Sequence, residues 1–489
     1  MLLALKKNDL LFILSVIVLL FIGMFLNFSV VGWMITLVFG VLAFVSPVYG
    51  LTMLFIYMPI RPFLIEYNPA MRAIADLVIL MLFLKVVWNS RKNIKSLFDF
   101  KVFEYAYFAF LIIGSVSALL MGVSIVAIIF QIRAFILFYL VYYVVRRLDI
   151  QKEDILRLAW SIIAITIILI VQGIVEKLSV RSAFLPLSWE QLPLSAKNRI
   201  RIYGMLGNPN VFGIFLSFSF ALFLYLRRLV QGKLVWGLNI MLALSMGLLI
   251  LTYSRGTWIA FGIAFLVYVV GTRNWKLILS VLKITVISGI LVVLPINLLT
   301  DYIESTESGS TKVGNIQQFD QGGQSSFSER IGSTFSDETI QGSQGSGRLY
   351  IVKKGFEIFQ DHPVIGTGFG TYGDSATLSH GSPLYEKYDV RPKFYSDNQY
   401  IQIIVQTGAV GVLLFAVFLL GMLMELWKIR KQSRYNIYMI GTVLSAYFMG
   451  VVYNLWESDI FGLVFFAMLG IAFHMKENVH KKWFGSTGS

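Results

Sequence analysis

The sequence predicts an all-α polytopic membrane protein with about fourteen transmembrane helices and one large extracytoplasmic loop that contains short helices. Of its 489 residues, 57% are hydrophobic and only 14% are charged, whereas a soluble surface needs roughly a quarter or more charged residues. Apolar runs of about 20 residues recur along the chain, and this length crosses a bilayer. The runs are continuously apolar rather than alternating, which argues against a transmembrane β-barrel.

The apolar runs can be placed along the chain as individual spans. The first begins at Leu10 and lacks a small-residue cleavage site, so we expect a retained helix rather than a signal peptide. The run at 47–60 is short and bounded by proline, which leaves the number of spans open by one pair. The predicted spans are 10–26, 30–45, 47–60, 72–88, 103–121, 123–145, 155–176, 209–226, 234–252, 256–271, 277–299, 399–427, 436–453 and 459–474.

Lys and Arg gather in alternate connections between these spans, and by the positive-inside rule they mark the cytoplasmic side. We therefore expect a multi-pass protein of the bacterial cytoplasmic (inner) membrane with both termini in the cytoplasm. The net charge of +14 follows largely from this topology rather than from nucleic-acid binding. The basic connections are 85–101, 146–152, 227–233, 273–276 and 428–434, whereas those at 27–29, 122 and 454–458 carry no Lys or Arg.

The predicted spans and loops divide the chain into five parts. Within the large loop, residues 305–347 are rich in Gly, Ser, Gln, Thr and Asp, so we expect this stretch to be mobile. A helix capped by Ser346 should follow it and stop before His362 and Pro363. The five parts are N-terminal helices (1–200), helices carrying two polar motifs (201–299), the extracytoplasmic loop (300–396), C-terminal helices (397–475), and a cytoplasmic tail (476–489) whose final Gly-Ser-Thr-Gly-Ser resembles a cloning remnant.

Two segments on the predicted outer side carry basic residues that topology does not explain. These are 177–208, which includes Arg199 and Arg201, and the loop 300–396, which includes Arg348. Anionic ligands would explain them, either lipid-linked diphosphates or an acidic polysaccharide. Ordinary solvation of a loop surface is the alternative.

The first polar motif is Tyr-Gly-Met-Leu-Gly-Asn-Pro-Asn at 203–210, which opens the predicted span at 209–226. Asn208 or Asn210 can cap that helix, and proline suits its first turn. Capping alone would account for the motif. Substrate binding by the two asparagines is the other interpretation.

The second motif is the tight turn Thr-Tyr-Ser-Arg-Gly-Thr-Trp at 252–258. It places Arg255 at the membrane surface beside Tyr253, Ser254 and Trp258. A guanidinium there can grip a diphosphate with two parallel hydrogen bonds. The alternative is an arginine that anchors a helix end by reaching toward water.

The third motif combines Arg348 with the stretch His-Pro-Val-Ile-Gly-Thr-Gly-Phe-Gly that begins at His362. The spaced glycines resemble a dinucleotide fingerprint, but the surrounding strand–helix–strand unit is missing, so we reject that interpretation. The glycines instead allow backbone to approach a phosphate or sugar closely, or to pack against the membrane helices.

The fourth motif is Asp397-Asn398-Gln399-Tyr400 at the start of the span 399–427. Asp397 is the best-placed carboxylate for a general base, and capping of the helix is the alternative role. Gly408 and Gly411 follow within the span.

Further polar residues lie at or near the spans. Gln131 and Arg133 fall inside one of them, where a charge is costly and usually paired or functional. Arg133 either faces a polar cavity that admits a lipid diphosphate or pairs with an acidic residue. Glu457 and Asp459 are acceptor contacts or helix-start charges favoured by the dipole, and an isolated loop histidine, His380, is a substitute base or simply solvated.

The four motifs, in this order and with the long loop between the second and fourth, resemble those of the O-antigen ligase and O-antigen polymerase superfamily. The resemblance covers roughly residues 200–475. It implies an inverting, metal-independent and cofactor-free glycosyltransferase whose donor is a glycan on undecaprenyl diphosphate. By resemblance, Arg255 and Arg348 are the catalytic candidates that bind the diphosphate, and Asp397 joins them as the candidate base because of its position in the fourth motif. The substrate-binding candidates are Arg199, Arg201, Asn208, Asn210, Tyr253, Ser254, Trp258, Arg133, His362, Asn398 and Tyr400.

One departure from that family favours polymerisation over ligation. Ligases of the superfamily carry histidine where this chain has Asp397. We therefore expect a polymerase that joins lipid-linked repeat units into an extracytoplasmic polysaccharide, which the basic loop suggests is acidic, as in teichuronic-acid or capsule synthesis. The alternatives are a ligase with a lipid, protein or wall acceptor, and a flippase or exporter of lipid-linked glycans. Expected partners are the lipid-linked donor and acceptor, membrane lipids and chain-length or export proteins.

Overall fold

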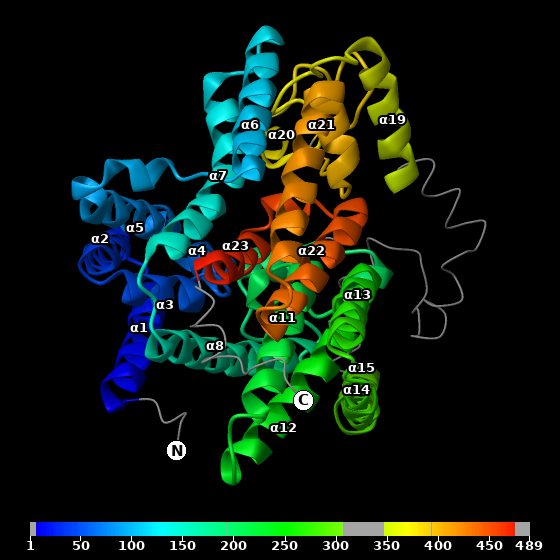
Figure 1. Cartoon of the computed structure of the whole chain (residues 1–489). Coiled ribbons are helices and arrows are strands. Elements are labelled where there is room, and N and C mark those ends of the chain that lie inside the picture. The colour runs from blue at the N-terminus through cyan, green and yellow to red at the C-terminus, as the bar shows by residue number, and fades with distance from the viewer. Residues whose placement is uncertain (1–5, 193, 307–346, 393, 475–489) are drawn as a thin grey trace. The chain divides into compact units, whose positions relative to one another are not determined.

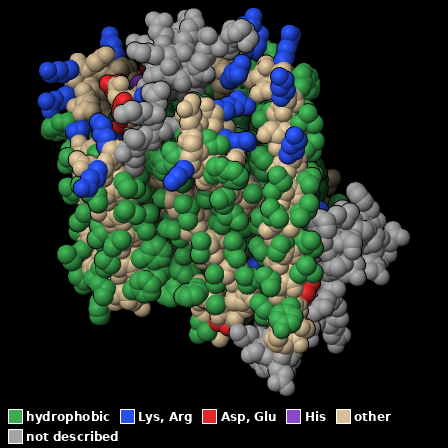
Figure 2. Space-filling model, turned by 90° about the horizontal axis from the view of Figure 1, so that it is seen from below, with side chains coloured by type: hydrophobic (Ala, Val, Ile, Leu, Met, Phe, Trp, Pro, Cys, Tyr) green, Lys and Arg blue, Asp and Glu red, His purple; other side chains and the backbone are tan. Residues whose placement is uncertain are grey.

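The computed structural model describes residues 6–192, 194–306, 347–392 and 394–474, and in these ranges the regular elements are helices, with no strand. Ten of the described helices are long and apolar enough to cross a membrane, or eleven if the bent pair α3 (Pro47–Tyr57) and α4 (Arg61–Tyr67) forms one span. Hydrophobic side chains cover most of the described surface seen in Figure 2. The prediction of an all-α polytopic membrane protein is confirmed.

Each of the fourteen predicted spans coincides with helical structure, but several helices are shorter or more broken than a full span. Shorter apolar helices occur at α2 (Ser29–Val45) and α23 (Asp459–His474). The predicted span 47–60 ends early, and α4 departs from α3 at 76°. Proline occupies the first turn of both helices, where its missing N–H costs nothing, so the sequence starts a second helix instead of extending the first.

The described chain divides into two compact units, each considered by itself. The first unit spans residues up to 89, 147–258 and 273 onward. In it, α11 packs beside α12 (Figure 1). Its helices are α1 (Lys7–Leu26), α2, α3, α4, α5 (Ile74–Asn89), α8 (Lys152–Leu178), the short α9 (Leu187–Glu190) and α10 (Ala196–Arg199), α11 (Pro209–Arg227), α12 (Lys233–Leu251), α14 (Lys276–Ser288) and α15 (Leu294–Ser305).

Two local features shape the first unit. Arg157 of α8 donates to the Asp9 carboxylate of α1 at 2.7 Å and lies 4.3 Å from the ring centre of Tyr49, so a nearly buried ion pair joins two helices.

The predicted span 277–299 contains a π-helical turn, Gly289–Val293, between α14 and α15. The turn lies just before Pro295, and a wider turn accommodates the hydrogen bond that proline cannot make.

The second unit contains residues 90–146, 259–272 and the described part of the chain from Gly347. Figure 1 shows α6 running alongside α21. Tyr107 stacks on Phe418 between them, with ring centres 4.5 Å apart. The helices are α6 (Val102–Leu120), α7 (Ile125–Arg147), most of α13 (Arg255–Thr272), α19 (Arg348–Asp361), α20 (Ser375–His380), α21 (Gln399–Lys428), α22 (Arg434–Val452) and α23.

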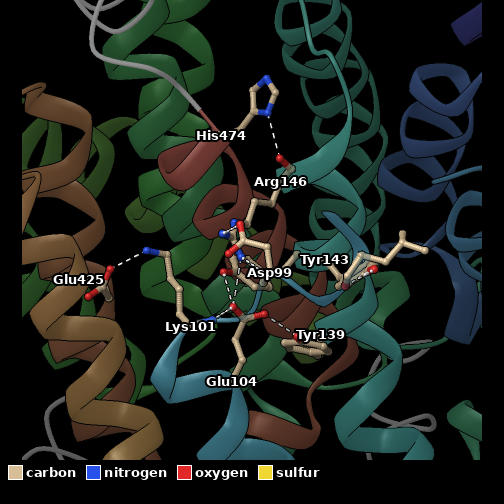
Figure 3. Close-up of polar contacts among 10 residues, drawn as sticks. Asp99, Lys101, Glu104, Tyr139, Tyr143, Arg146, Glu425 and His474 are labelled. Carbon is tan, nitrogen blue, oxygen red and sulfur yellow. Dashed lines mark hydrogen bonds and ion pairs between the residues drawn. The ribbon is translucent and has the colours of Figure 1, made fainter. Parts of the chain in front are cut away.

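A polar cluster ties the start of α6 to the ends of α7 and α21 (Figure 3). Glu104 is fully buried and accepts hydrogen bonds from the Tyr139 hydroxyl at 2.6 Å and from Arg146 at 3.3 Å. Arg146 also pairs with Asp99, and Lys101 pairs with Glu425 at 2.5 Å. These basic residues belong to predicted inner connections, and here each has a carboxylate partner.

The segment 300–396, which is predicted to be extracytoplasmic, is described only in part. Residues 307–346, which include most of the stretch expected to be mobile and the expected cap Ser346, lie outside the described residues. Helix α19 ends at Asp361, directly before His362 and Pro363, as predicted. Its buried face is formed by Ile351, Val352 and Ile358, which join a core with Tyr372 and Tyr385.

Candidate functional site

In the first unit, Asn208 caps α11. Its side-chain oxygen accepts the backbone N–H groups of Asn210 at 2.9 Å and Val211 at 3.3 Å, and Pro209 occupies the first helical position. These bonds satisfy donors that a helix start would otherwise leave unpaired. Of the two predicted cap candidates, Asn208 is therefore the cap, and the Asn210 side chain is left for another contact.

Asn210 joins the first two motifs. Its side-chain oxygen accepts from the Arg201 guanidinium at 2.7 Å and from the Ser254 hydroxyl at 2.8 Å. Arg201 also donates to the carbonyl of Thr252 at 2.8 Å, and the Trp258 indole N–H donates to the carbonyl of Leu249 at 2.9 Å. Segments 44 and 51 residues apart in sequence are thus held together by one polar network.

The C-terminal end of α8 holds the backbone that leads into this network. Glu176, fully buried, accepts the N–H of Gly204 at 2.7 Å and that of Tyr203 at 3.2 Å, and it pairs with Arg181. The Arg181 guanidinium lies 4.2 Å from the centre of the Tyr203 ring. Lys177 donates to the carbonyl of Ile200 at 2.7 Å.

The arginines near this polar network differ in the groups that they contact and in their exposure to solvent. Arg181 is compensated by a buried carboxylate, and Arg201 braces Asn210 and the turn at 252–258. Arg199 is half-buried, whereas Arg255 is exposed as the first residue of α13. Position and exposure therefore make Arg255 the most accessible of the candidate anion-binding arginines described in this unit.

In the second unit, the glycine-rich stretch fills a break in α21. Gly408 has φ 60° and ψ −163°, so the helix is interrupted there. The freed backbone groups bond to the stretch: Gly368 N–H donates to the carbonyl of Gln406 at 2.7 Å, and Ala409 N–H donates to that of Pro363 at 2.9 Å. A Cβ on Gly368 would lie 1.9 Å from the backbone nitrogen of Ala118. The sequence predicted that these glycines either approach a phosphate or sugar or pack against membrane helices. In the structure they pack against membrane helices.

The other residues of the third motif contribute less. Arg348 is the first residue of α19, but its side chain lies outside what the structure describes. The Nε2 atom of His362 is buried without a hydrogen-bond partner among the described residues. His380 is exposed at the end of α20, with its ring 5.6 Å from that of Phe130.

In the fourth motif, a neighbour of Asp397 caps the helix α21. Asn398, not Asp397, is the N-cap of α21, and its side-chain oxygen accepts the N–H groups of Tyr400 and Ile401 at 3.1 Å each. Asp397 is half-buried with φ 46°, a left-handed conformation that aspartate tolerates. Tyr400 donates its hydroxyl to the carbonyl of Tyr447 at 2.7 Å, which is a packing contact.

Asp397 lies in an acidic and aromatic environment. Burial raises the pKa of the Tyr453 hydroxyl, and the negative charges of Asp397, Asp459 and Glu457 raise it further. Burial and the nearby charge of Glu457 also raise the pKa of Tyr395, with a smaller contribution from Asp397. Three carboxylates therefore influence one pair of tyrosines on the predicted outer side.

Glu457 belongs to a buried network rather than to a helix start. It accepts from the Ser375 backbone N–H at 2.9 Å and hydroxyl at 2.5 Å, and from Gln402. Burial raises its pKa to about 7, and the neighbouring Asp374 carboxylate adds to the rise. The helix-start interpretation fits Asp459, which is the first residue of α23.

Asp374 is the centre of the same network. Its carboxylate is fully buried and accepts from Gln406 at 2.6 Å, Gly370 N–H at 2.7 Å and Thr377 N–H at 2.8 Å. Burial raises the pKa of this carboxyl group, and these hydrogen bonds oppose the rise. The network holds the loop segment 370–377 on the start of α21.

Residues 240–416 match the family described as O-antigen ligase. This part of the chain is therefore similar to O-antigen ligases. The match confirms the resemblance to the O-antigen ligase and polymerase superfamily and indicates an enzyme that transfers glycans. No curated protein matches the chain.

The matched region includes three of the four predicted motifs. It begins within α12 and ends in α21 beyond the break at Gly408, so it contains Arg255, the glycine-rich stretch and Asp397. The Asn-Pro-Asn motif lies before the match, but Asn210 contacts the matched region through Ser254. Arg133, half-buried in α7, also lies outside the match.

The sequence interpretation missed several polar residues in and around the matched region. Glu176 and Asp374 were not identified, and neither was the face of α21 formed by Gln399, Gln402 and Gln406. The signal for Glu176 and the three glutamines was a polar residue in an otherwise apolar helix, which usually has a buried partner, whereas Asp374 lies in a polar loop that gave no such signal. Among the described residues, no group of three or more acidic, histidine or cysteine side chains is arranged to hold a metal ion.

Proposed function

We propose that the protein is an inverting glycosyltransferase that polymerises undecaprenyl-diphosphate-linked repeat units into an extracytoplasmic polysaccharide. The O-antigen ligase match supports glycan transfer, and the aspartate at position 397 supports polymerisation through the departure noted above. The observation that carries the proposal is that Asn398 caps α21, so the neighbouring Asp397 carboxylate is not used as the cap.

In this mechanism the Asp397 carboxylate accepts the proton of an acceptor sugar hydroxyl. The hydroxyl oxygen attacks the anomeric carbon of the donor from the face opposite its diphosphate. The bond between that carbon and the diphosphate oxygen breaks, and undecaprenyl diphosphate leaves with the electron pair. An activated donor of this kind mainly needs positioning and neutralisation of charge on the leaving group.

Arg255 is the proposed diphosphate ligand in the first unit. It is exposed at the start of α13, where the N–H groups of the helix also favour an anion. Asn210, Ser254 and Arg201 brace the turn that carries it. We assign Arg201 and Asn210 to this bracing, whereas Arg199 and Arg348 remain further diphosphate candidates. Basic residues on the predicted outer side suit an acidic glycan.

Mass spectrometry of undecaprenyl-diphosphate glycans from cells lacking the protein tests the proposal. Accumulation of single repeat units is expected, because a missing polymerase leaves its substrates unjoined. Long polymer stranded on the lipid carrier would instead support the second candidate, a ligase, which the family description favours. A wild-type distribution of lipid-linked glycans would overturn both.

A further inference from the structure

A cationic pocket in the first unit has no role in the function proposed above. The pocket has a volume of about 290 Å³ and lies between the end of α11 and the start of α14. Its polar lining comprises Arg227, Arg228, Asn274, Lys276 and Ser280. These elements belong to connections that the charge pattern places on the cytoplasmic side.

The positive charges of this pocket are not neutralised by the described protein. No ion pair involves Arg227, Arg228 or Lys276 in the described residues, and residues 191–300 contain no Asp or Glu. In the same unit, Arg157 contacts both Asp9 and Asp154. The positive-inside rule explains why basic residues occur here, but it does not explain a pocket of unpaired cations.

The surroundings of the pocket match the depth of a lipid headgroup. Trp275, next to the pocket residue Lys276, is 58% exposed. Exposed tryptophans are typical of the boundary between headgroups and acyl chains. Leu224 and Leu277 add apolar surface to the lining. A ligand with an anionic head and an apolar body would contact both the basic and the apolar residues of the lining.

We propose that this pocket binds the phosphate headgroup of an anionic membrane phospholipid. Two guanidinium groups can grip phosphate oxygens bidentately, and the Lys276 ammonium adds a point charge. The Asn274 amide and the Ser280 hydroxyl can bond the remaining oxygens of a phosphodiester or glycerol headgroup. The site is separate from the glycan chemistry and does not depend on it.

The test compares retained lipid by native mass spectrometry of the full-length protein in neutral detergent. Wild type is supplied with phosphatidylglycerol or with phosphatidylcholine. The pocket variant is Arg227→Gln/Arg228→Gln/Lys276→Gln, and the matched control is Arg430→Gln/Lys431→Gln/Arg434→Gln. Both triple variants remove three positive charges from predicted inner connections, so non-specific attraction to anionic lipid falls equally.

We expect wild type and the control to retain one phosphatidylglycerol, and the pocket variant to bind it on the order of tenfold more weakly or worse. Equal retention by the pocket variant and the control would overturn the site, as would equal retention of phosphatidylcholine by wild type. If millimolar inorganic phosphate displaces the lipid, the pocket is a site for free phosphate and the lipid assignment fails. Size-exclusion profiles verify that each variant is folded.

Discussion

At the scale of single residues, Asp397 and Asn398 are neighbours with separate roles. Asn398 caps α21, while Asp397 keeps a left-handed backbone and a half-buried carboxylate among Tyr395, Tyr453 and Glu457. Asparagine tolerates the same backbone conformation as aspartate. An isosteric exchange at Asp397 therefore removes basicity while preserving the local fold.

Asp397→Asn should lower the rate of glycan polymerisation by roughly 10²- to 10⁴-fold, the usual contribution of a general base. The assay is the chain-length profile formed from purified lipid-linked repeats. Asn398→Asp serves as control, because aspartate caps a helix as well as asparagine does. A wild-type rate for Asp397→Asn would remove the base assignment.

Arg255 gives a second prediction at this scale. Arg255→Ala should reduce turnover by roughly 10²-fold or more without loss of folded protein, because the side chain is exposed. Arg273→Ala removes an equally exposed charge from a predicted inner connection and should leave turnover unchanged. The measurement is polymer formation per folded protein. Wild-type polymer from Arg255→Ala would exclude this arginine as an essential diphosphate ligand.

At the scale of elements, the broken helix α21 and the glycine-rich stretch form one structural feature. Each supplies backbone partners that the other lacks, which explains how a helix can unwind within an apolar region. Gly368 has φ +90° and no room for a side chain, since a Cβ would meet the backbone of Ala118. The contact cannot relax without moving α6.

Gly368→Ala should destabilise the protein by at least about 3 kcal/mol, through both backbone strain and overlap with a neighbouring helix. Gly381→Ala is the matched control, because its φ is also positive at +78° but nothing lies within 4 Å of the added carbon. It should cost only about 1–2 kcal/mol. Thermal unfolding in detergent measures both. Similar unfolding temperatures for the two variants would contradict the packing explanation.

At the scale of the whole molecule, the buried carboxylates make stability depend on pH. Burial beside Asp374 raises the pKa of Glu457 to about 7 in the folded protein, above its ordinary value of 4.5. The folded state therefore binds more protons than the unfolded state between these values. Stability from this group is fully present below pH 4.5 and is lost as the pH rises through about 7.

The unfolding temperature should therefore increase when the pH falls from 8 to about 5.5, a range that spans the raised pKa. Glu457→Gln should show a smaller increase, because its amide does not titrate. Some dependence should persist, since burial also raises the pKa of Asp374. Differential scanning fluorimetry of both proteins provides the measurement. Identical pH profiles would rule out Glu457 as a source of the effect.

Much of this protein could be predicted from local sequence because its lipid environment imposes simple rules. Continuous apolar runs predicted the helices, and the short, proline-bounded run at 47–60 is where the structure bends between two helices. Four motifs predicted the resemblance to the superfamily that the family match supports, and a turn with Arg255 predicted an arginine at a helix start. Such features depend on residues that are adjacent in the chain, so periodicity and spacing reveal them.

Tertiary structure alone decided which of the polar residues act on one another. Asn210 contacts Ser254 forty-four residues away, and Glu457 contacts Ser375 eighty-two residues away. It also decided that Asn398 rather than Asp397 caps α21 and that the glycines pack against helices. A buried polar group must find a partner wherever the fold provides one, and the sequence of a single segment does not contain that partner.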